Sequence, residues 1–153
     1  MKERPCGTCG EGTIRPRNVR GMVMDHRDDP AVRVRSDLVL PLCDVCGEMI
    51  FTKESARALD EALEASYVAK RRKMQCALIN DLRRRGFTQR QIESFASVSP
   101  GYLSKLRKGK IASGSTFRLL YLLHAMPDEA MAIVARLDPR LTRSAAKATA
   151  HAH

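Results

Sequence analysis

The stretch of sequence that decides the fold is residues 88–109, TQRQIESFASVSPGYLSKLRKG. Thr88 followed three residues later by Gln91 is a capping-box pattern, in which each side chain bonds the other residue's backbone N–H at the start of a helix. Ser99 followed by Pro100 predicts a second helix start, with Ser99 as N-cap and Pro100 in the first helical position. The stretch therefore predicts two short helices joined by a tight turn, a helix-turn-helix.

Apolar residues in the same stretch fall where two such helices would pack together. Ile92 and Phe95 should point inward from the first helix, with Val98 filling the turn. Leu103 and Leu106 should hold the second helix against the first. In a helix-turn-helix the second helix enters the major groove of DNA, where its early residues reach base edges. The residues that we expect to face DNA are Gln89, Arg90, Ser99, Gly101, Tyr102, Lys105, Lys108 and Lys110.

We expect different DNA contacts from different members of this set. Lys105, on the second helix, is placed to bond a guanine or a phosphate. Gln89 lies at a helix N-terminus and should meet a phosphate together with backbone N–H groups. Lys108 and Lys110 add positive charge at the phosphates, which makes binding sensitive to salt.

The distribution of charge favours DNA binding by the second half of the chain. The net charge is +10, but residues 1–66 hold 10 Lys/Arg and 12 Asp/Glu, whereas residues 67–153 hold 17 and 5. So basic a segment is typical of a protein that binds a polyanion. An anionic membrane would also attract it, but a membrane-surface helix needs an apolar face opposite the charge. We therefore expect double-stranded DNA and no membrane, with a generic helical bundle of basic surface as the alternative.

Four of the five cysteines form two CxxC pairs, Cys6 with Cys9 and Cys43 with Cys46. Each pair offers two sulfur ligands on one tight turn, and two pairs complete the tetrahedron that zinc prefers. No apolar stretch follows the charged N-terminus, so we expect no signal peptide, a cytoplasmic protein, and metal binding rather than disulfides. The sequence therefore predicts one zinc ion per chain.

Other interpretations of these cysteines stay open at this point. They could be reduced thiols or a redox dithiol, although a thioredoxin-like CxxC requires a strand-to-helix turn that the pattern lacks. His26 could replace one cysteine as a ligand. Four thiolates leave no open coordination position, so we expect a structural rather than a catalytic zinc. Cys76 stands outside both pairs and is expected to pack as a small buried or half-buried residue.

We do not expect an enzyme. The sequence has no His-x-Glu element, no paired carboxylates in a metal-binding pattern, and no Ser/His/Asp set that spacing would bring together. A zinc-dependent enzyme acting on nucleic acid is therefore the weakest of the hypotheses.

The order of these patterns predicts an α+β chain, with a small β-rich four-cysteine zinc module joined by a helix to an all-α domain of five helices. Strands of the module are expected at residues 13–15, 32–35 and 38–40, with a turn at 28–30. From Thr52 the apolar residues recur at helical spacing, which predicts a helix to about Lys73. The residues that recur at this spacing are Ala56, Leu59, Leu63 and Tyr67.

The all-α domain is expected to begin with a separate helix that ends at Gly86, a left-handed terminator. The two helices of residues 88–109 follow, then an apolar helix over about 116–126 and a last helix that ends before Pro139. The expected boundaries are 1–66 for the zinc module, 67–75 for a basic helical linker, 76–138 for the all-α domain and 139–153 for a disordered tail.

These motifs, in this order, resemble the MqsA-type antitoxins, in which a YgiT-type zinc module precedes an Xre-type helix-turn-helix. The resemblance spans Cys6 to about Leu137 and is carried by the segments CGTCGEG, CDVCGE, FTKESA, TQRQ, LSKLRKG and STFRLL. The chain departs from the family's pattern where Asn and Arg often face the bases, at Gly101 and Lys105. It also has Glu93 where the family commonly packs a small Ala, and Ser97 where the family has a Gly in the turn.

The resemblance implies a zinc module that is structural and faces a small ribonuclease toxin, and we expect this toxin to be basic. It also implies a second domain that forms a homodimer, binds a palindromic operator and represses its own operon. We expect the dimer interface on the apolar helix over 116–126, through Leu119 and Leu123. The alternative is a stand-alone zinc-containing regulator without a toxin, which could respond to zinc or to oxidants through its thiolates.

Overall fold

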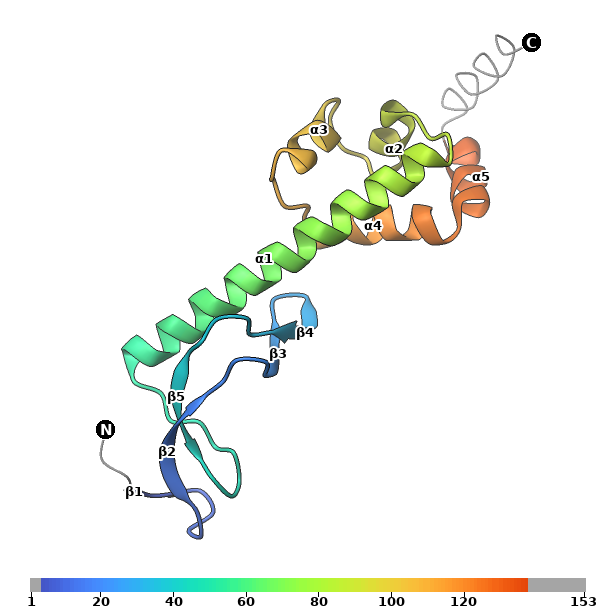
Figure 1. Ribbon diagram of the computed structural model, residues 1–153. Helices are drawn as coiled ribbons and strands as arrows, with labels where there is room; N and C mark the ends of the chain where they lie inside the picture. The colour runs from blue at the N-terminus through green and yellow to red at the C-terminus, as the bar shows by residue number, and fades with distance from the viewer. Residues whose placement is uncertain (1–3, 138–153) are drawn as a thin grey trace, which may run out of the picture. The chain divides into compact units, whose positions relative to one another are not determined.

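The computed structural model describes residues 4–137, and the chain divides into two compact units, residues 1–69 and 70–153. Figure 1 shows the strands in the first unit and a set of short helices in the second. The mixture of small antiparallel sheets and helices confirms the expected α+β class. The tail expected at 139–153 lies outside the described residues.

The first unit contains two small antiparallel sheets. One has the strand order β1-β2-β5, formed by β1 (Arg4–Pro5), β2 (Thr13–Asn18) and β5 (Val39–Cys43). The other is a hairpin of β3 (Val23–His26) and β4 (Asp29–Arg33). The pairing of β2 with β5 brings the two cysteine motifs, which are far apart in the sequence, to the same end of the first sheet.

The hairpin differs from the strands expected there. The turn falls at Arg27, whose left-handed φ is 54°, and Asp28, so that Pro30 lies inside β4 instead of in the turn. The sequence VMDH of β3 was not expected as a strand because it lacks a period-two apolar pattern. β3 forms because its backbone pairs with β4, and such pairing between strands cannot be inferred from the local sequence.

One continuous helix, α1, runs over Lys53–Arg84 and contributes to both units. The expectation of two helices with a break after Lys73 was wrong. Residues 70–76 read KRRKMQC, and they contain no glycine, proline or N-capping residue that would end one helix and begin another.

Both ends of α1 carry the local signals that the sequence predicts. The Ser55 N–H donates to Thr52 Oγ1 at 3.2 Å, and the Thr52 N–H donates to Ser55 Oγ at 2.8 Å. At the other end Gly86 has a φ of 92°, and the Phe87 N–H donates to the Leu82 carbonyl at 3.1 Å. This is a Schellman ending, so the expected terminator at Gly86 is confirmed.

The core of the first unit is formed by one face of α1 and the strands. Leu59, Leu63 and Tyr67 are buried on this face, as expected, whereas Ala56 is exposed. The core residues from the strands and their connections are Val19, Val32, Val34, Leu40 and Leu42.

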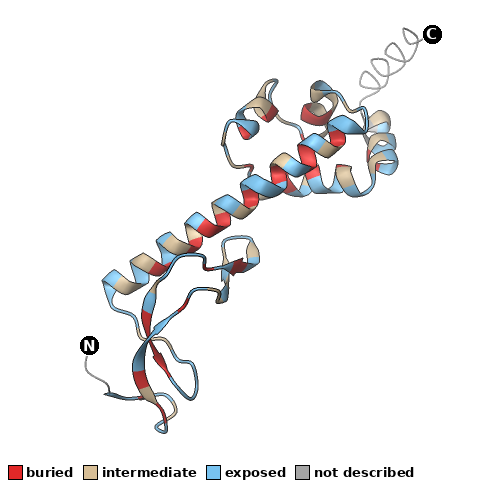
Figure 2. Cartoon of the chain, viewed as in Figure 1, coloured by how far each residue is buried: buried red, intermediate tan, exposed pale blue. Residues whose placement is uncertain are grey.

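The described part of the second unit adds four helices to the end of α1. Their bounds are Gln89–Phe95 for α2, Tyr102–Arg107 for α3, Gly114–Ala125 for α4 and Pro127–Leu137 for α5. Figure 2 shows that buried positions recur along α1 and α4. The side chains that are completely buried in this core are Ile79, Leu82, Ile92, Leu106, Leu120 and Leu123.

The burial of α4 corrects one expectation about the dimer. Leu123 has 0% of its surface exposed, and Leu119 is half-buried. Leu123 is therefore a core residue of the single chain and is not spare for an interface. The periodicity of so apolar a helix did not distinguish its inner from its outer face.

Candidate functional site

The four cysteines of the CxxC pairs form one cluster at the end of the three-stranded sheet. Their Sγ atoms all lie within 4.8 Å of one another. The Sγ atoms of Cys6 and Cys46 are 3.7 Å apart, as are those of Cys9 and Cys43. A metal ion held tetrahedrally by thiolates at about 2.3 Å requires sulfurs about 3.8 Å apart, so the cluster fits such an ion. The four cysteines therefore lie close enough to bind a metal ion, as expected.

Each CxxC pair sits on the same kind of turn. Gly10 and Gly47 follow the second cysteine of their pairs and have φ values of 71° and 74°, which favour glycine. The Gly12 N–H donates to Cys9 Sγ, and the Val45 N–H donates to Cys43 Sγ, both at 3.4 Å. Such N–H groups stabilise thiolates: those of Gly12 and then Glu11 lower the pKa of Cys9 to about 6.

Gly12 is a residue of this site that the sequence reasoning did not single out. A Cβ atom at Gly12 would collide with Cys43 Sγ and would lie 2.9 Å from Asp44 Oδ1. No side chain is therefore tolerated where the first cysteine loop meets the second. Gly12 is the last glycine of the segment CGTCGEG, but the sequence alone does not show that its lack of a side chain makes room for Cys43 Sγ.

His26, the alternative ligand, is placed elsewhere in the first unit. Its Nε2 lies 2.9 Å from Glu64 Oε2, and Arg27 Nε lies 2.7 Å from the same oxygen. The hydrogen bond from His26, with a smaller effect from Arg27, lowers the pKa of Glu64. These contacts fasten the β3–β4 turn to α1, which gives His26 a structural role away from the cysteine cluster.

In the second unit, the α2–turn–α3 segment is compatible with a helix-turn-helix. The capping box at the start of α2 is confirmed, because Thr88 and Gln91 exchange both hydrogen bonds. Val98 packs against the core from the turn, as expected. Ser97 adopts a left-handed φ of 51°, so the turn takes a conformation that usually favours glycine without having one there.

The start of α3 differs from the expected one. Its N-cap is Gly101, with a φ of 82° and no side-chain cap, and the helix begins at Tyr102. The expected N-cap at Ser99 was wrong, because Ser99 and Pro100 belong to a turn in which the Tyr102 N–H donates to the Ser99 carbonyl at 3.1 Å.

A buried carboxylate from α2 supplies the missing cap. Glu93 has 5% of its surface exposed, and its Oε1 accepts a hydrogen bond from the Leu103 N–H at 3.0 Å. The same oxygen accepts from Gln89 Nε2 at 2.9 Å. Glu93, which the sequence analysis treated as a departure from a small packed residue, therefore fixes α3 against α2.

The residues expected to face DNA are mostly accessible. Arg90, Ser99, Lys105, Lys108 and Lys110 are exposed, and the half-buried ones are Gln89, Gly101 and Tyr102. The Nζ of Lys110 lies 4.5 Å from the centre of the Tyr102 ring, a cation–π contact.

Gln89 is already engaged within the protein. Its Nε2 lies 2.9 Å from Glu93 Oε1 and 3.2 Å from Ser104 Oγ. Glu93 requires a donor, which orients the amide with its nitrogen toward the protein. Both amide hydrogens then have partners, and the amide oxygen accepts from Ser104 Oγ at 3.5 Å. An amide oxygen cannot donate to a phosphate, so in this conformation the Gln89 side chain does not make the phosphate contact that we expected.

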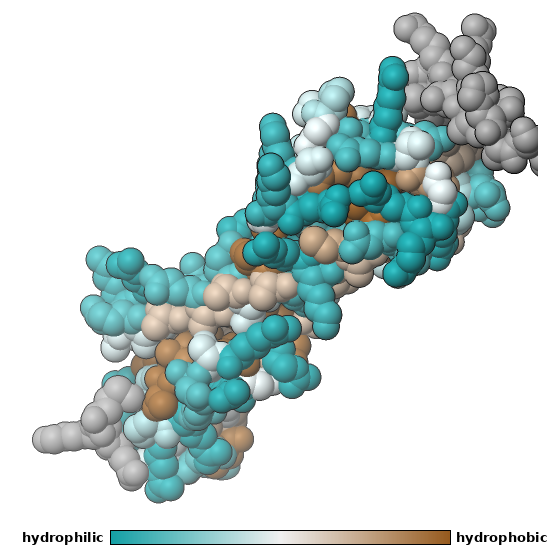
Figure 3. Space-filling view, turned by 45° about the horizontal axis from the view of Figure 1, so that its top comes forward, coloured by the Kyte–Doolittle hydropathy of each residue, from teal (hydrophilic) through white to brown (hydrophobic). Residues whose placement is uncertain are grey.

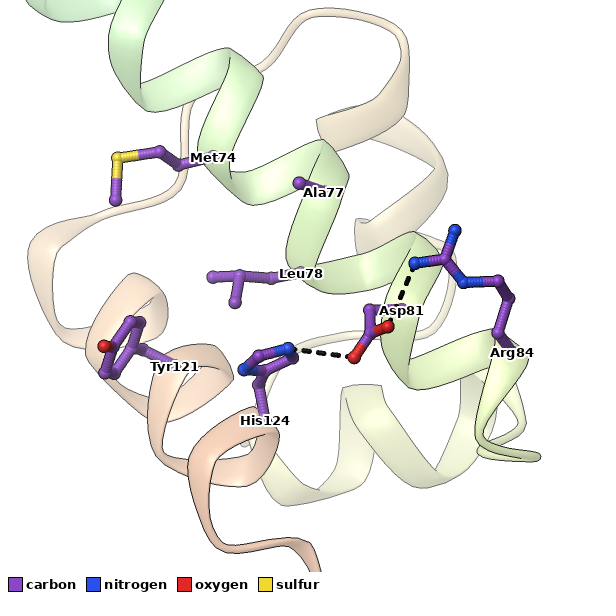
Figure 4. A pocket seen from close by; sticks show the side chains of 7 residues that line it. All are labelled: Met74, Ala77, Leu78, Asp81, Arg84, Tyr121 and His124. Carbon is purple, nitrogen blue, oxygen red and sulfur yellow. Dashed lines mark hydrogen bonds and ion pairs between the residues drawn. The ribbon is translucent and has the colours of Figure 1, made fainter.

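A shallow cavity of about 340 Å³ lies on the second unit between α1 and α4 (Figure 4). Asp81 and His124 form an ion pair of 2.9 Å at this cavity, and Arg85 Nε lies 2.8 Å from the same carboxylate oxygen. A hydrogen bond from Arg84, with the charges of Arg85 and His124, lowers the pKa of Asp81. These ion pairs tie α1 to α4, so we assign the cluster a structural role; the contacts of the buried Asp81 Oδ2 with His124 and Arg85 are electrostatic, because this oxygen accepts no hydrogen bond of good geometry.

Comparison with known proteins does not assign this chain to a family. The sequence matches no protein-family model and no curated protein.

Hydrophilic side chains dominate the face of the second unit that Figure 3 shows. No helix within residues 4–137 has the length and apolar character to cross a membrane.

Proposed function

We propose that the protein is a DNA-binding transcriptional repressor, with α2–turn–α3 as its DNA-reading element. The observation that carries the proposal is the geometry of this segment, in which α3 is held by its apolar side to the core and turns Lys105 outward. Leu103 and Leu106 are at most 1% exposed, whereas Lys105, on the opposite side, is exposed. This is the arrangement that allows a second helix to enter a major groove.

The charge of the second unit supports the same proposal. Residues 70–137 hold 14 Lys/Arg and 4 Asp/Glu. Two of these acids have partners inside the unit: Asp81 pairs with His124 and with arginines, and Glu93 caps α3. The remaining cations attract a polyanion and accelerate its association.

We propose that the ion of the cysteine cluster is zinc, one per chain, in a structural role. Four thiolates match the preference of zinc and leave no position open for water or substrate. Bound zinc would supply a cross-link between the two cysteine loops. Cys6 and Cys9 would hold it from one side and Cys43 and Cys46 from the other, with Gly12 keeping the loops in contact.

We further propose that the repressor is a homodimer that acts as a type II antitoxin and binds a palindromic operator. This extension rests on the resemblance to MqsA-type antitoxins and on two properties of the first unit. Residues 1–66 are net acidic, and Val23, Val39, Val45 and Phe51 are exposed there, which suits a basic protein partner. Co-expression of the full chain with the product of a neighbouring gene tests it: relief of that product's toxicity supports the antitoxin, and no effect favours a stand-alone regulator.

The DNA proposal is tested by selection from random duplexes with the full-length, zinc-loaded protein. We expect enrichment of a two-fold symmetric site, and about a tenfold or greater loss of affinity for that site in Lys105→Ala. Lys53→Ala removes an exposed positive charge from the first unit and should leave affinity unchanged. Enrichment of no sequence would contradict the proposal, and an unaffected Lys105→Ala would mean that α3 does not read the bases.

A further inference from the structure

The loop that follows α3 is fixed to α1 by a buried amide. Gln75, with 0% of its surface exposed, donates from Nε2 to the carbonyls of Leu106 at 3.1 Å and Lys110 at 2.7 Å. Its Oε1 accepts from the Ala112 N–H at 3.0 Å. Three hydrogen bonds from one side chain therefore set where the backbone between Leu106 and Ala112 runs, and with it the positions of Lys108 and Lys110.

Arg72, about one turn before Gln75 on α1, lies against the same loop. The Cζ of its guanidinium is 3.6 Å from the position that a Cβ on Gly109 would take. Gly109 has a φ of 119°, a conformation that favours glycine, and it carries no side chain to cover the guanidinium. The arginine of α1 thus reaches the loop between Lys108 and Lys110.

Arg72 thus joins two lysines that flank Gly109 in the chain, Lys108 and Lys110. Arg72, Lys108 and Lys110 are all exposed, and no carboxylate in the described part of the chain pairs with any of them. Lys110 contacts the Tyr102 ring, which orients its ammonium without removing its charge. Such a concentration of unpaired positive charge on one loop and the neighbouring helix attracts an anion.

We propose that Arg72 is a phosphate-binding residue of the DNA surface, which with Lys108 and Lys110 forms a three-cation site for a phosphodiester beside Gly109. This inference rests on the proposed function. It extends the DNA contact from the α2–α3 segment to α1. The planar fork of a guanidinium matches two phosphate oxygens at once, and DNA presents such oxygens along both edges of the groove that α3 would enter.

The salt dependence of DNA binding tests this role. The full-length, zinc-loaded protein is titrated with a duplex of about 30 base pairs, which is longer than the footprint of one dimer. The titration is repeated at salt concentrations from about 50 to 200 mM. Each phosphate contact adds about 0.9 to the slope of log affinity against log salt. Because a dimer carries two copies of Arg72, Arg72→Ala should lower the slope by about 1.8 per dimer, so that the wild type loses about 12-fold more affinity than the variant over this range.

Matched variants separate a phosphate contact from a general effect of charge or folding. Arg136→Ala removes the same charge from an exposed position on α5 and should keep the wild-type slope. Arg72→Lys should retain most of the slope, and Arg72→Gln provides a neutral side chain of similar length in case the alanine variant unfolds. An unchanged slope in folded Arg72→Ala or Arg72→Gln would overturn the inference while leaving the proposed function intact. A wild-type protein that binds no duplex at any salt concentration would overturn both.

Discussion

Replacing Glu93 tests the unusual way in which α3 is held. In Glu93→Ala, the Leu103 N–H and Gln89 Nε2 both lose their acceptor, and Leu103 is only 1% exposed. A buried N–H without a partner costs about 1–3 kcal/mol, which includes the loss of the helix cap. For a domain of this size, that corresponds to a decrease of roughly 5 to 20 °C in the melting temperature of the second unit.

Glu93→Gln is the matched control because it keeps an acceptor and the same shape. Its amide oxygen can still receive both hydrogen bonds, so we expect a smaller loss than in the alanine variant. Thermal unfolding followed by circular dichroism gives the stability, and amide hydrogen exchange gives the local effect. The Leu103 N–H should exchange faster in Glu93→Ala than in either other protein, with little change at the α4 amides that remain buried.

The opposite result is physically reasonable and would refute the reasoning. Burying a carboxylate costs free energy, and an apolar replacement can be neutral or stabilising. Alanine is also the residue that the resembled family packs at this position. If Glu93→Ala melted at or above the wild-type temperature, desolvation of the carboxylate would outweigh its hydrogen bonds, and the cap of α3 would have to come from elsewhere.

Two further predictions concern the metal centre and the Asp81 cluster. Gly12→Ala should lower the metal content measured by native mass spectrometry, because a Cβ there collides with Cys43 Sγ, whereas Gly7→Ala has open space and should keep the metal. Asp81→Asn should melt at a lower temperature than the wild type at neutral pH. Because the pKa of Asp81 is lowered, its stabilisation should be complete above the ordinary carboxyl pKa of about 4 and disappear as the pH falls through the lowered value. A difference that stays constant down to the most acidic pH would contradict this assignment.

The features that the sequence predicted well depend on neighbours in the chain. The capping box of Thr88 and Gln91, the terminator at Gly86 and the grouping of four cysteines each follow from a short motif whose chemistry admits few geometries. The inward positions of Ile92 and Leu106 follow from helical periodicity in the same way.

The features that were missed depend on contacts between distant residues. The continuity of α1 through residues 70–76 agrees with the absence of a glycine, proline or capping residue there, but packing in each unit is what holds the helix along its whole length. Glu93 and Ser97 depart from the resembled pattern, and only the fold shows that a carboxylate replaces a cap at Gly101 and that Ser97 accepts a left-handed backbone. The burial of Leu123 is likewise decided by three-dimensional packing.

The measurement that tests the proposed function most directly is a map of the amide NMR signals that move when duplex DNA is added to the full-length, zinc-loaded protein. The proposal predicts that the largest shifts fall on residues 88–110, with an accompanying change at the Arg72 side chain, and that α5 and the strands of the first unit change little. Shifts concentrated on α5 or on the cysteine loops, with α3 unaffected, would contradict a DNA-reading role for α2–turn–α3.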